Sequence, residues 1–133
     1  MKLRKGELFA IFLLIISYPI AYYFYTKFPE TVASHWNAQG QADGYISSFW
    51  GAFTLPIIVT VTSLLMIFIP KADPKKANIK KFLPYFDGFI VFIELFFAYL
   101  YALTVVWNLG HTFNFTSYIL PAFLALFFYI GIM

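Results

Sequence analysis

The sequence predicts an all-α protein: a polytopic transmembrane four-helix bundle with an ordered extracytoplasmic loop between its first and second helices. Composition is the first reason, because hydrophobic residues make up 62% of the chain and charged residues 11%, against about half and about a quarter in soluble domains. The second reason is that four apolar runs approach the length that crosses a bilayer. The third is a single long polar interval between the first two runs. We therefore treat residues 1–133 as one membrane domain.

The first predicted span covers about residues 8–26 and follows a short basic segment. Its apolar part, Leu8 to Tyr25, is about 18 residues long, and no convincing small-residue cleavage site follows it. Both features oppose a cleaved signal peptide and favour a retained transmembrane helix. Pro19 lies inside the run and is expected to kink the helix, because proline lacks a backbone N–H.

The polar interval predicts an outer loop over residues 28–48, and a proline at its start is expected to stop the first helix. Two turn signals follow, one from Asn37 to Gly40 and one at Asp43-Gly44. Asn, Asp and Gly readily adopt the backbone angles that tight turns require. The pattern therefore favours a compact loop folded back on the membrane.

Three further spans are predicted at about residues 49–69, 82–107 and 118–133. Pro70 is expected to end the second span, and residues 70–81, which contain five lysines, are expected to form a cytoplasmic loop. The fourth run, of about 16 residues, reaches roughly 24 Å, less than the roughly 30 Å hydrocarbon core. We therefore expect the fourth helix to be barely complete, or the chain to be cut short.

The distribution of basic residues predicts the orientation of these spans. Three precede the first span and five lie in the lysine-rich loop, whereas the outer loop region contains only Lys27 and the loop around His111 contains none. Both termini are therefore expected in the cytoplasm, with the two histidine-bearing loops outside. The lysine-rich loop is expected to lie near anionic lipid head groups. Nucleic-acid binding is excluded, because the basic residues form no element that reads a groove.

The outer loop holds a set of candidate ligand-binding or loop-organising residues: His35, Trp36, Asn37, Gly40, Asp43, Gly44 and Tyr45. We expect His35 and Asp43 either to fix the loop by hydrogen bonds to each other or to backbone, or to recognise an outer ligand. With His111 they are also weak candidates for a zinc site, since they match a zinc ligand set in type but not in spacing. Trp36 and Tyr45 are expected to be interfacial anchors or contact residues.

A second polar set recurs every seven residues along the third span: Asp87, Glu94, Tyr101 and Asn108. This spacing places the four residues on nearly one helix face. Glu94 lies near the predicted bilayer centre, where an ionised acid costs about 3 kcal/mol or more. We expect Glu94 to be protonated and hydrogen-bonded to a facing Tyr, Ser or Thr; a proton or cation path is the alternative.

No pattern in the sequence predicts catalysis. The chain has no nucleophile elbow, phosphate-binding glycine loop or carboxylate pair of catalytic spacing. It also has no cysteine for disulfide or thiolate chemistry. We therefore expect no enzyme activity and no cofactor. A small transport or ion-coupled module using Glu94 is one alternative function, and a metal-dependent membrane hydrolase is another.

The outer loop resembles the signature of a bacterial membrane family. The matching loop residues are Pro29, Val32, His35-Trp36-Asn37, Gly40 and Asp43-Gly44-Tyr45. At this spacing they resemble the amino-terminal domain of unknown function (DUF1648) of SdpI-type toxin-immunity proteins. Further matching segments are Pro70-Lys71, Asp73-Pro74, Asn78-Ile79 with Phe82, and Asn108-Leu109-Gly110. The resemblance covers roughly residues 18–114.

The resemblance implies a multi-pass protein of the bacterial cytoplasmic membrane that binds or neutralises a secreted antimicrobial peptide at the outer face. In some members protection is coupled to sequestering a repressor at the membrane, so a cytoplasmic regulator is a second expected partner beside the lipid bilayer. Longer members continue into a further cytoplasmic segment and more helices, whereas this sequence ends at Met133. Functions that need that second half are not implied here.

Overall fold

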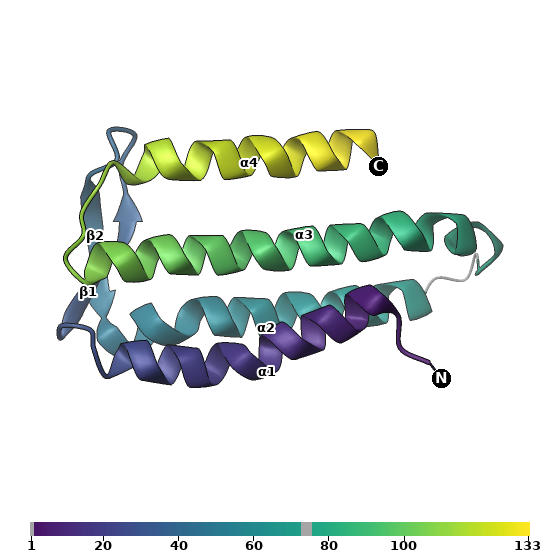
Figure 1. The fold of residues 1–133 in the computed structure, drawn as a ribbon, viewed down its shortest axis with the longest axis horizontal. Helices are drawn as coiled ribbons and strands as arrows, with labels where there is room; N and C mark the ends of the chain where they lie inside the picture. Colours follow the sequence, from purple (N-terminus) through teal and green to yellow (C-terminus); the bar gives the residue numbers. More distant parts are fainter. Residues whose placement is uncertain (1, 73–75) are drawn as a thin grey trace.

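The computed structural model of the protein describes residues 2–72 and 76–133, with only the backbone for residues 76–78. Its elements are α1 (Lys5–Tyr25), β1 (Thr31–Trp36), β2 (Ala42–Ser47), α2 (Ser48–Ala72), α3 (Lys76–Asn108) and α4 (Phe115–Ile132). The four helices run side by side, and the two strands lie across one end of them (Figure 1).

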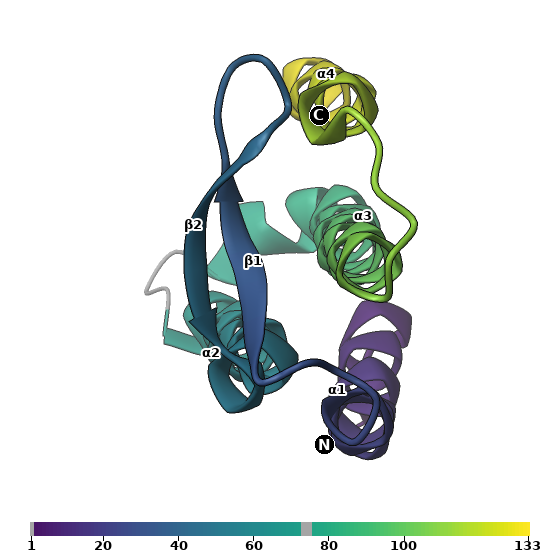
Figure 2. The ribbon, with the colours of Figure 1, turned by 90° about the vertical axis from the view of Figure 1, so that its left-hand side faces the viewer.

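Three helices form a packed group and the fourth lies outside it (Figure 2). α1 packs against α2 and α3, and α2 also packs against α3. α4 packs against another side of α3 and lies away from α1 and α2. The hairpin of β1 and β2 reaches across the helix ends from α2 to α4. The predicted four-helix arrangement is therefore present as three helices plus one, with α3 as the neighbour of all the others.

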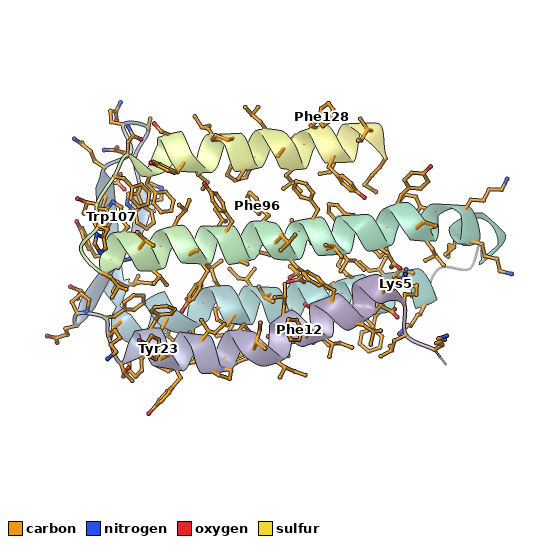
Figure 3. The ribbon with its side chains drawn as sticks, viewed as in Figure 1. Lys5, Phe12, Tyr23, Phe96, Trp107 and Phe128 are labelled. Atoms are coloured by element: carbon orange, nitrogen blue, oxygen red, sulfur yellow. The ribbon has the colours of Figure 1, made fainter. Side chains whose placement is uncertain are left out.

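The helices carry the surface expected of membrane spans. All four are long and apolar enough to cross a membrane, which indicates a multi-pass membrane protein. Bulky apolar side chains point outward (Figure 3): Phe12 of α1 is 57% exposed and Phe128 of α4 is 71% exposed. Apolar exposure on this scale suits lipid rather than water. Phe96 points instead between α3 and α4, where its ring centroid lies 5.0 Å from that of Phe123.

Several helix ends differ from the predicted spans. α2 continues through Pro70, so this proline does not end it. α3 already begins at Lys76, so both ends of the predicted loop over residues 70–81 are helical. Residues 73–75 of that prediction lie outside the described part of the chain. α4 begins at Phe115 and has 18 residues, or about 27 Å at 1.5 Å per residue. The predicted fourth span started three residues too late, because the first turn of α4 contains polar residues.

The segment predicted as an outer loop contains a small antiparallel sheet, which the all-α prediction did not include. β1 pairs with β2 from Thr31 opposite Ser47 to Trp36 opposite Ala42, with irregular register on either side of His35. The predicted turn at Asp43-Gly44 is wrong, because both residues belong to β2. The two strands are six residues long, and apolar and polar residues alternate only weakly along them, so each resembles a polar loop in sequence. Their extended conformation depends on pairing with each other.

The two ends of the helical group are distinct (Figure 1). The hairpin and the α3–α4 connection, residues 109–114, lie at one end, which we name the hairpin end. Both chain termini point toward the opposite end, which we name the terminal end. The loops that carry His35 and His111 therefore lie at the same end of the molecule.

Candidate functional site: a hairpin bonded to the helix ends

The hairpin is held against α2 at its base. β2 ends at Ser47 and α2 begins at Ser48, with no residue between them. The Ser48 backbone N–H donates to the Glu30 carbonyl at 2.9 Å. Val32 is 1% exposed and occupies the space beside Gly51, where an added Cβ would clash with it. The base of the hairpin and the first turn of α2 therefore form one packed unit.

Asn108, the last residue of α3, forms hydrogen bonds to the middle of β1. Its Oδ1 accepts from the Ala33 N–H at 2.7 Å, and its Nδ2 donates to the Ala33 carbonyl at 3.1 Å. Nδ2 also donates to the Thr104 carbonyl at 3.0 Å within α3. Buried backbone groups need such partners, and Ala33 is 1% exposed. The sequence placed Asn108 among the intramembrane polar residues, whereas the structure makes it the clamp that positions the hairpin.

Asn37 builds the turn between the strands. Its Oδ1 accepts from the backbone N–H groups of Gln39 at 3.0 Å and Gln41 at 2.9 Å. Its own N–H donates to the Gln41 carbonyl at 2.9 Å. Gly40 has a φ of +76°, a left-handed conformation that costs other residues about 1–2 kcal/mol. The turn signal from Asn37 to Gly40 thus corresponds to the observed turn.

The tip of the hairpin is bonded to the start of α4. Thr116 Oγ1 donates to the Asn37 carbonyl at 2.8 Å. Asn114 Nδ2 donates to the Gln39 carbonyl at 3.1 Å. These bonds join residues more than seventy positions apart in sequence, so α4 is attached to the hairpin as well as to α3.

Asn114 has a second role and was missed by the sequence reasoning, as was Thr116. Asn114 Oδ1 accepts from the Ser117 N–H at 3.1 Å and thereby caps α4. A Cβ at Gly40 would clash with the Asn114 amide, so the glycine also allows this close approach. Asparagine is a favoured N-cap residue, and its position a few residues before an apolar run is a helix-start signal. That signal could have identified Asn114, although not its bond to the hairpin.

Trp36 fills the space between the hairpin and two helix ends. Its ring stacks on Phe115 at the start of α4, with centroids 3.8 Å apart and planes 8° apart. It meets Trp107 near the end of α3 edge-on, with centroids 5.7 Å apart; Trp107 lies beside the hairpin in Figure 3. The sequence predicts an anchor or contact residue, whereas here the ring packs the hairpin onto α3 and α4.

His35 and Asp43 form a pair that is exposed on the hairpin. The His35 Nδ1–H donates to Asp43 Oδ1 at 2.5 Å, and the two side chains are 72% and 44% exposed. Gly44 lies opposite His35, and a Cβ there would be 2.9 Å from the His35 Cβ. The glycine therefore leaves room for the imidazole. The two side chains project from the surface of the sheet and do not contribute to its packing against the helices.

The three candidate zinc ligands do not come together. Among the described residues, no three His, Cys, Asp or Glu side chains lie close enough to hold a metal ion. His35 and Asp43 meet each other, and His111, which is exposed in the connection after α3, does not join them. The zinc alternative therefore lacks a third ligand in this part of the chain.

An open hollow of about 640 Å³ lies along the hairpin tip and the α3–α4 connection. It is lined by Gln39, Gly40, Gln41, Ala42, Tyr45, Trp107, Thr112, Phe113 and Asn114. Tyr45 is 59% exposed and is two residues from Asp43, so both side chains project from the same face of β2. The hollow thus places aromatic side chains, Tyr45, Trp107 and Phe113, beside amides, and aromatic residues are enriched at protein interfaces.

The polar stripe of α3 faces the packed group of helices and the hairpin. Asp87 and Tyr101 contact α1, Glu94 contacts α2, and Asn108 contacts β1. The seven-residue spacing therefore does place these residues along one face. Each has a different partner, so they form a row of separate contacts rather than one connected site.

Glu94 and Ser63 are bonded in the interior, and both are 0% exposed. Ser63 Oγ donates to Glu94 Oε1 at 2.8 Å, which is a partner of the type that the sequence predicts. The nearby Thr60 behaves differently, since its hydroxyl donates to the Pro56 carbonyl at 2.9 Å. Tyr18 of α1 lies 2.7 Å from Thr60 Oγ1 and is its hydrogen-bond donor, because the Thr60 proton is already used.

A cluster of four charged residues lies at the terminal end and was missed by the sequence reasoning: Arg4, Glu7, Lys71 and Asp87. Arg4 contacts Glu7 at 3.2 Å and Asp87 at 3.1 Å, the latter as an ion pair without hydrogen-bond geometry. Lys71 Nζ lies 3.6 Å from Glu7 Oε1. The Glu7 side chain is only 3% exposed. The cluster thus ties α1 to both α2 and α3 near the predicted cytoplasmic face.

The prolines do not break the helices. Pro19 lies within α1, Pro56 within α2 and Pro121 within α4, and each helix continues past its proline. Transporters of the broken-helix type place unwound segments at their binding sites. None of these three helices shows such a segment.

One family model matches part of the chain. A model described as "Domain of unknown function (DUF1648)" matches residues 10–60. The match spans most of α1, the whole hairpin and the first half of α2, and it confirms the domain part of the resemblance. No curated protein and no solved structure matches the chain. The molecule is thus a multi-pass helical membrane protein whose hairpin lies within a segment matching a domain of unknown function.

Proposed function

We propose that the protein is a toxin-immunity or sensing component of the bacterial cytoplasmic membrane. In this role it binds or neutralises a secreted antimicrobial peptide through its hairpin, without catalysis. The observation that carries the proposal is the exposed His35–Asp43 pair on a hairpin that is bonded to helices at its base, middle and tip. A rigid support suits recognition, because little conformational order has to be created when a ligand binds.

The proposal requires the hairpin end to face the outside of the cell. Basic residues favour this orientation: Lys2, Arg4 and Lys5 precede or begin α1, and Lys71 lies in the last turn of α2. At the hairpin end, Lys27 is the only lysine or arginine in residues 26–48 and 109–114. A secreted peptide would then meet the hairpin and the α3–α4 connection before the other described parts of the chain.

The hollow along the hairpin tip supports a peptide as the ligand. Tyr45 and Phe113 offer apolar rings, Gln39 and Gln41 offer amides, and Asp43 offers a carboxylate on the same face of β2 as Tyr45. Aromatic rings are enriched at protein interfaces, and tyrosine is one of the residues that most often contribute strongly when a partner covers them. A cationic, partly apolar peptide is the complementary partner, because it could contact the carboxylate and the rings together.

A survival experiment tests the proposal. The full chain would be expressed in a sensitive Gram-positive host that is then challenged with a panel of secreted membrane-active peptides. Variants His35→Ala, Asp43→Ala and Tyr45→Ala would be compared at matched membrane levels. His111→Ala is the control, because it removes an exposed histidine from the same end without touching the pair.

Protection by the wild type and by His111→Ala, but not by the hairpin variants, is the expected result. Protection by all variants alike would contradict recognition through the pair. Absence of protection against every peptide would contradict the immunity role. Direct binding of the protective peptide to protein in nanodiscs would separate recognition from indirect effects on growth.

A transport or ion-coupled role for Glu94 is the second candidate. The buried Glu94–Ser63 bond between α2 and α3 favours it, since an acid inside a membrane is a functional candidate by default. The continuous helices oppose it. Measurement of pH-dependent ion flux in proteoliposomes, with Glu94→Gln beside the wild type, distinguishes the two functions.

A further inference from the structure

A cavity of about 320 Å³ lies within the group of α1, α2 and α3, in the half nearer the hairpin. Its lining is almost wholly apolar, apart from Ser17, Glu94 and Tyr101. The Ser17 hydroxyl already donates to the Leu14 carbonyl at 2.8 Å. Known small-ligand pockets begin at about this size and combine apolar walls with a few polar groups. The remaining question is what Glu94 and Tyr101 can bind.

Two polar atoms on the lining are buried without a partner in the described part of the chain: Glu94 Oε2 and the Tyr101 hydroxyl. Glu94 is 0% exposed, and Ser63 occupies only its other oxygen. A buried polar group without a hydrogen bond is unfavourable. A ligand that supplied a hydrogen-bond donor to Oε2 would remove this cost, whereas a bare hydrocarbon chain would not.

The cavity opens sideways rather than toward an end of the molecule. Four of its lining residues are exposed on the outer surface of the helical group: Ile20 of α1 and Ala98, Ala102 and Val106 of α3. The two alanines are one helical turn apart and leave space that larger side chains would fill. This opening lies on surface that we assign to lipid, so a ligand would enter from within the membrane.

We propose that this cavity binds a single-chain lipophilic amine, which takes up the proton of the Glu94 carboxyl and pairs as an ammonium group with Glu94 Oε2, with its alkyl chain along the apolar wall of α3. The ammonium is favoured because no ion pair of Glu94 exists among the described residues, and a charge-assisted bond gains strength in an apolar medium. The wall from Glu94 to Val105 spans eleven residues, or about 16 Å, which suits one extended chain.

The proposal predicts a ranking of three probes of equal chain length. An alcohol can bond to Oε2 but brings no charge, so n-dodecanol binds more weakly than n-dodecylamine. An ionised fatty acid brings a second negative charge against Glu94 and no hydrogen-bond donor, so n-dodecanoate does not bind. This inference concerns a site in the interior and does not rest on peptide recognition by the hairpin.

Binding would be measured on the full chain in phosphatidylcholine nanodiscs, with empty nanodiscs subtracting the share of each probe that dissolves in lipid. Glu94→Gln keeps the side-chain shape and an oxygen for Ser63 but cannot carry charge. Ala98→Phe fills the mouth of the cavity without altering Glu94. Leu95→Phe is the control. It adds the same bulk beside Glu94 in sequence, but residue 95 is 52% exposed and does not line the cavity.

We expect the wild type and Leu95→Phe to bind the amine about tenfold more tightly than the alcohol. Glu94→Gln removes that preference, and Ala98→Phe removes saturable binding of both probes. Equal binding of all three probes to the wild type would mean that any bilayer chain occupies the cavity, which overturns the proposal. Undiminished amine preference in Glu94→Gln overturns it as well. If Glu94→Gln does not fold, Ala98→Phe serves as the test instead. Saturable amine binding retained by Ala98→Phe would overturn the proposal.

Discussion

The hairpin end and the terminal end hold their polar side chains in different ways. At the hairpin end, neutral side chains bond to backbone groups of other elements; these are Asn108, Asn114 and Thr116. At the terminal end, charged side chains bond to one another; these are Arg4, Glu7, Lys71 and Asp87. The first arrangement fixes the path of the main chain, and the second joins helix to helix.

This difference indicates which end can carry a recognition surface. Bonds from Asn108 to the Ala33 backbone hold the strand while leaving the side chains of its neighbours available, as the exposed His35–Asp43 pair shows. The charge cluster uses its own side chains as the connection, and the Glu7 side chain is only 3% exposed. We therefore expect substitutions at the terminal end to change stability, and substitutions on the hairpin to change recognition.

Arg4→Ala should produce the largest loss of stability. It removes both ion pairs of Arg4. The almost buried Glu7 carboxylate then keeps only the backbone N–H of residue 4, which donates to Oε2 at 2.9 Å, and the more distant Lys71. The free energy of unfolding should fall by about 2–4 kcal/mol. This is somewhat less than the roughly 3–5 kcal/mol lost when a fully buried ion pair is broken, because the Arg4 side chain is 20% exposed. Thermal and denaturant unfolding in detergent measures this. The exposed Lys2→Ala should change stability little; an equal effect of both substitutions would contradict the cluster.

Asn108→Ala should loosen the hairpin with a smaller loss of stability, about 2 kcal/mol, because both backbone polar groups of Ala33 lose a partner. Amide hydrogen exchange should accelerate through β1 while α1 keeps its protection. Leu109→Ala, at a residue 41% exposed, is the neighbouring control. Unchanged exchange in β1 would mean that the strand pairing alone holds the hairpin.

Gly40→Ala should detach the hairpin tip from α4 and cost about 1–2 kcal/mol from backbone strain, plus the clash with Asn114. Gly110→Ala is a matched control, since Gly110 has a φ of +103° and no atom within 4 Å of an added Cβ. The difference between the two variants therefore isolates the contact between hairpin and α4. Hydrogen exchange in the first turn of α4 should rise in Gly40→Ala alone.

His35→Ala should have the smallest effect on stability, below about 1 kcal/mol, because exposed ion pairs contribute little. Its effect on peptide protection should nevertheless be the largest of the set. A loss of more than about 2 kcal/mol in denaturant unfolding would assign the pair a structural role and remove the contrast between the two ends.

The four helices are predictable from the sequence because long apolar runs determine them with little help from other parts of the chain. The row from Asp87 to Asn108 is also predictable, since helical periodicity fixes which residues share a face. The class of partner for Glu94 follows from the cost of an unpaired acid in a membrane. Its identity as Ser63 does not, because that depends on how α2 and α3 pack.

The parts that were missed depend on contacts between distant segments. The Asn108 amide meets Ala33 across 75 positions, and no local pattern marks that pairing. In the sequence, Arg4 belongs to the basic segment before the first span and Asp87 to the polar set of the third span. Only the packing of α1 against α3 brings the two together. The hairpin was read as a loop because Asp43-Gly44 is a frequent turn dipeptide, and pairing with β1 overrides that preference here.

The direct passage of β2 into α2 couples the hairpin mechanically to the membrane-embedded part of the protein. The junction lacks a flexible connector, since Ser47 and Ser48 are consecutive and the Ser48–Glu30 bond and the Val32–Gly51 contact hold it on both sides. A partner that pulls or tilts the hairpin therefore applies torque to α2. The terminal end of α2 carries Lys71, whose Nζ lies 3.6 Å from Glu7 Oε1 of α1. A tilt of α2 caused by displacement of the hairpin would therefore alter this contact.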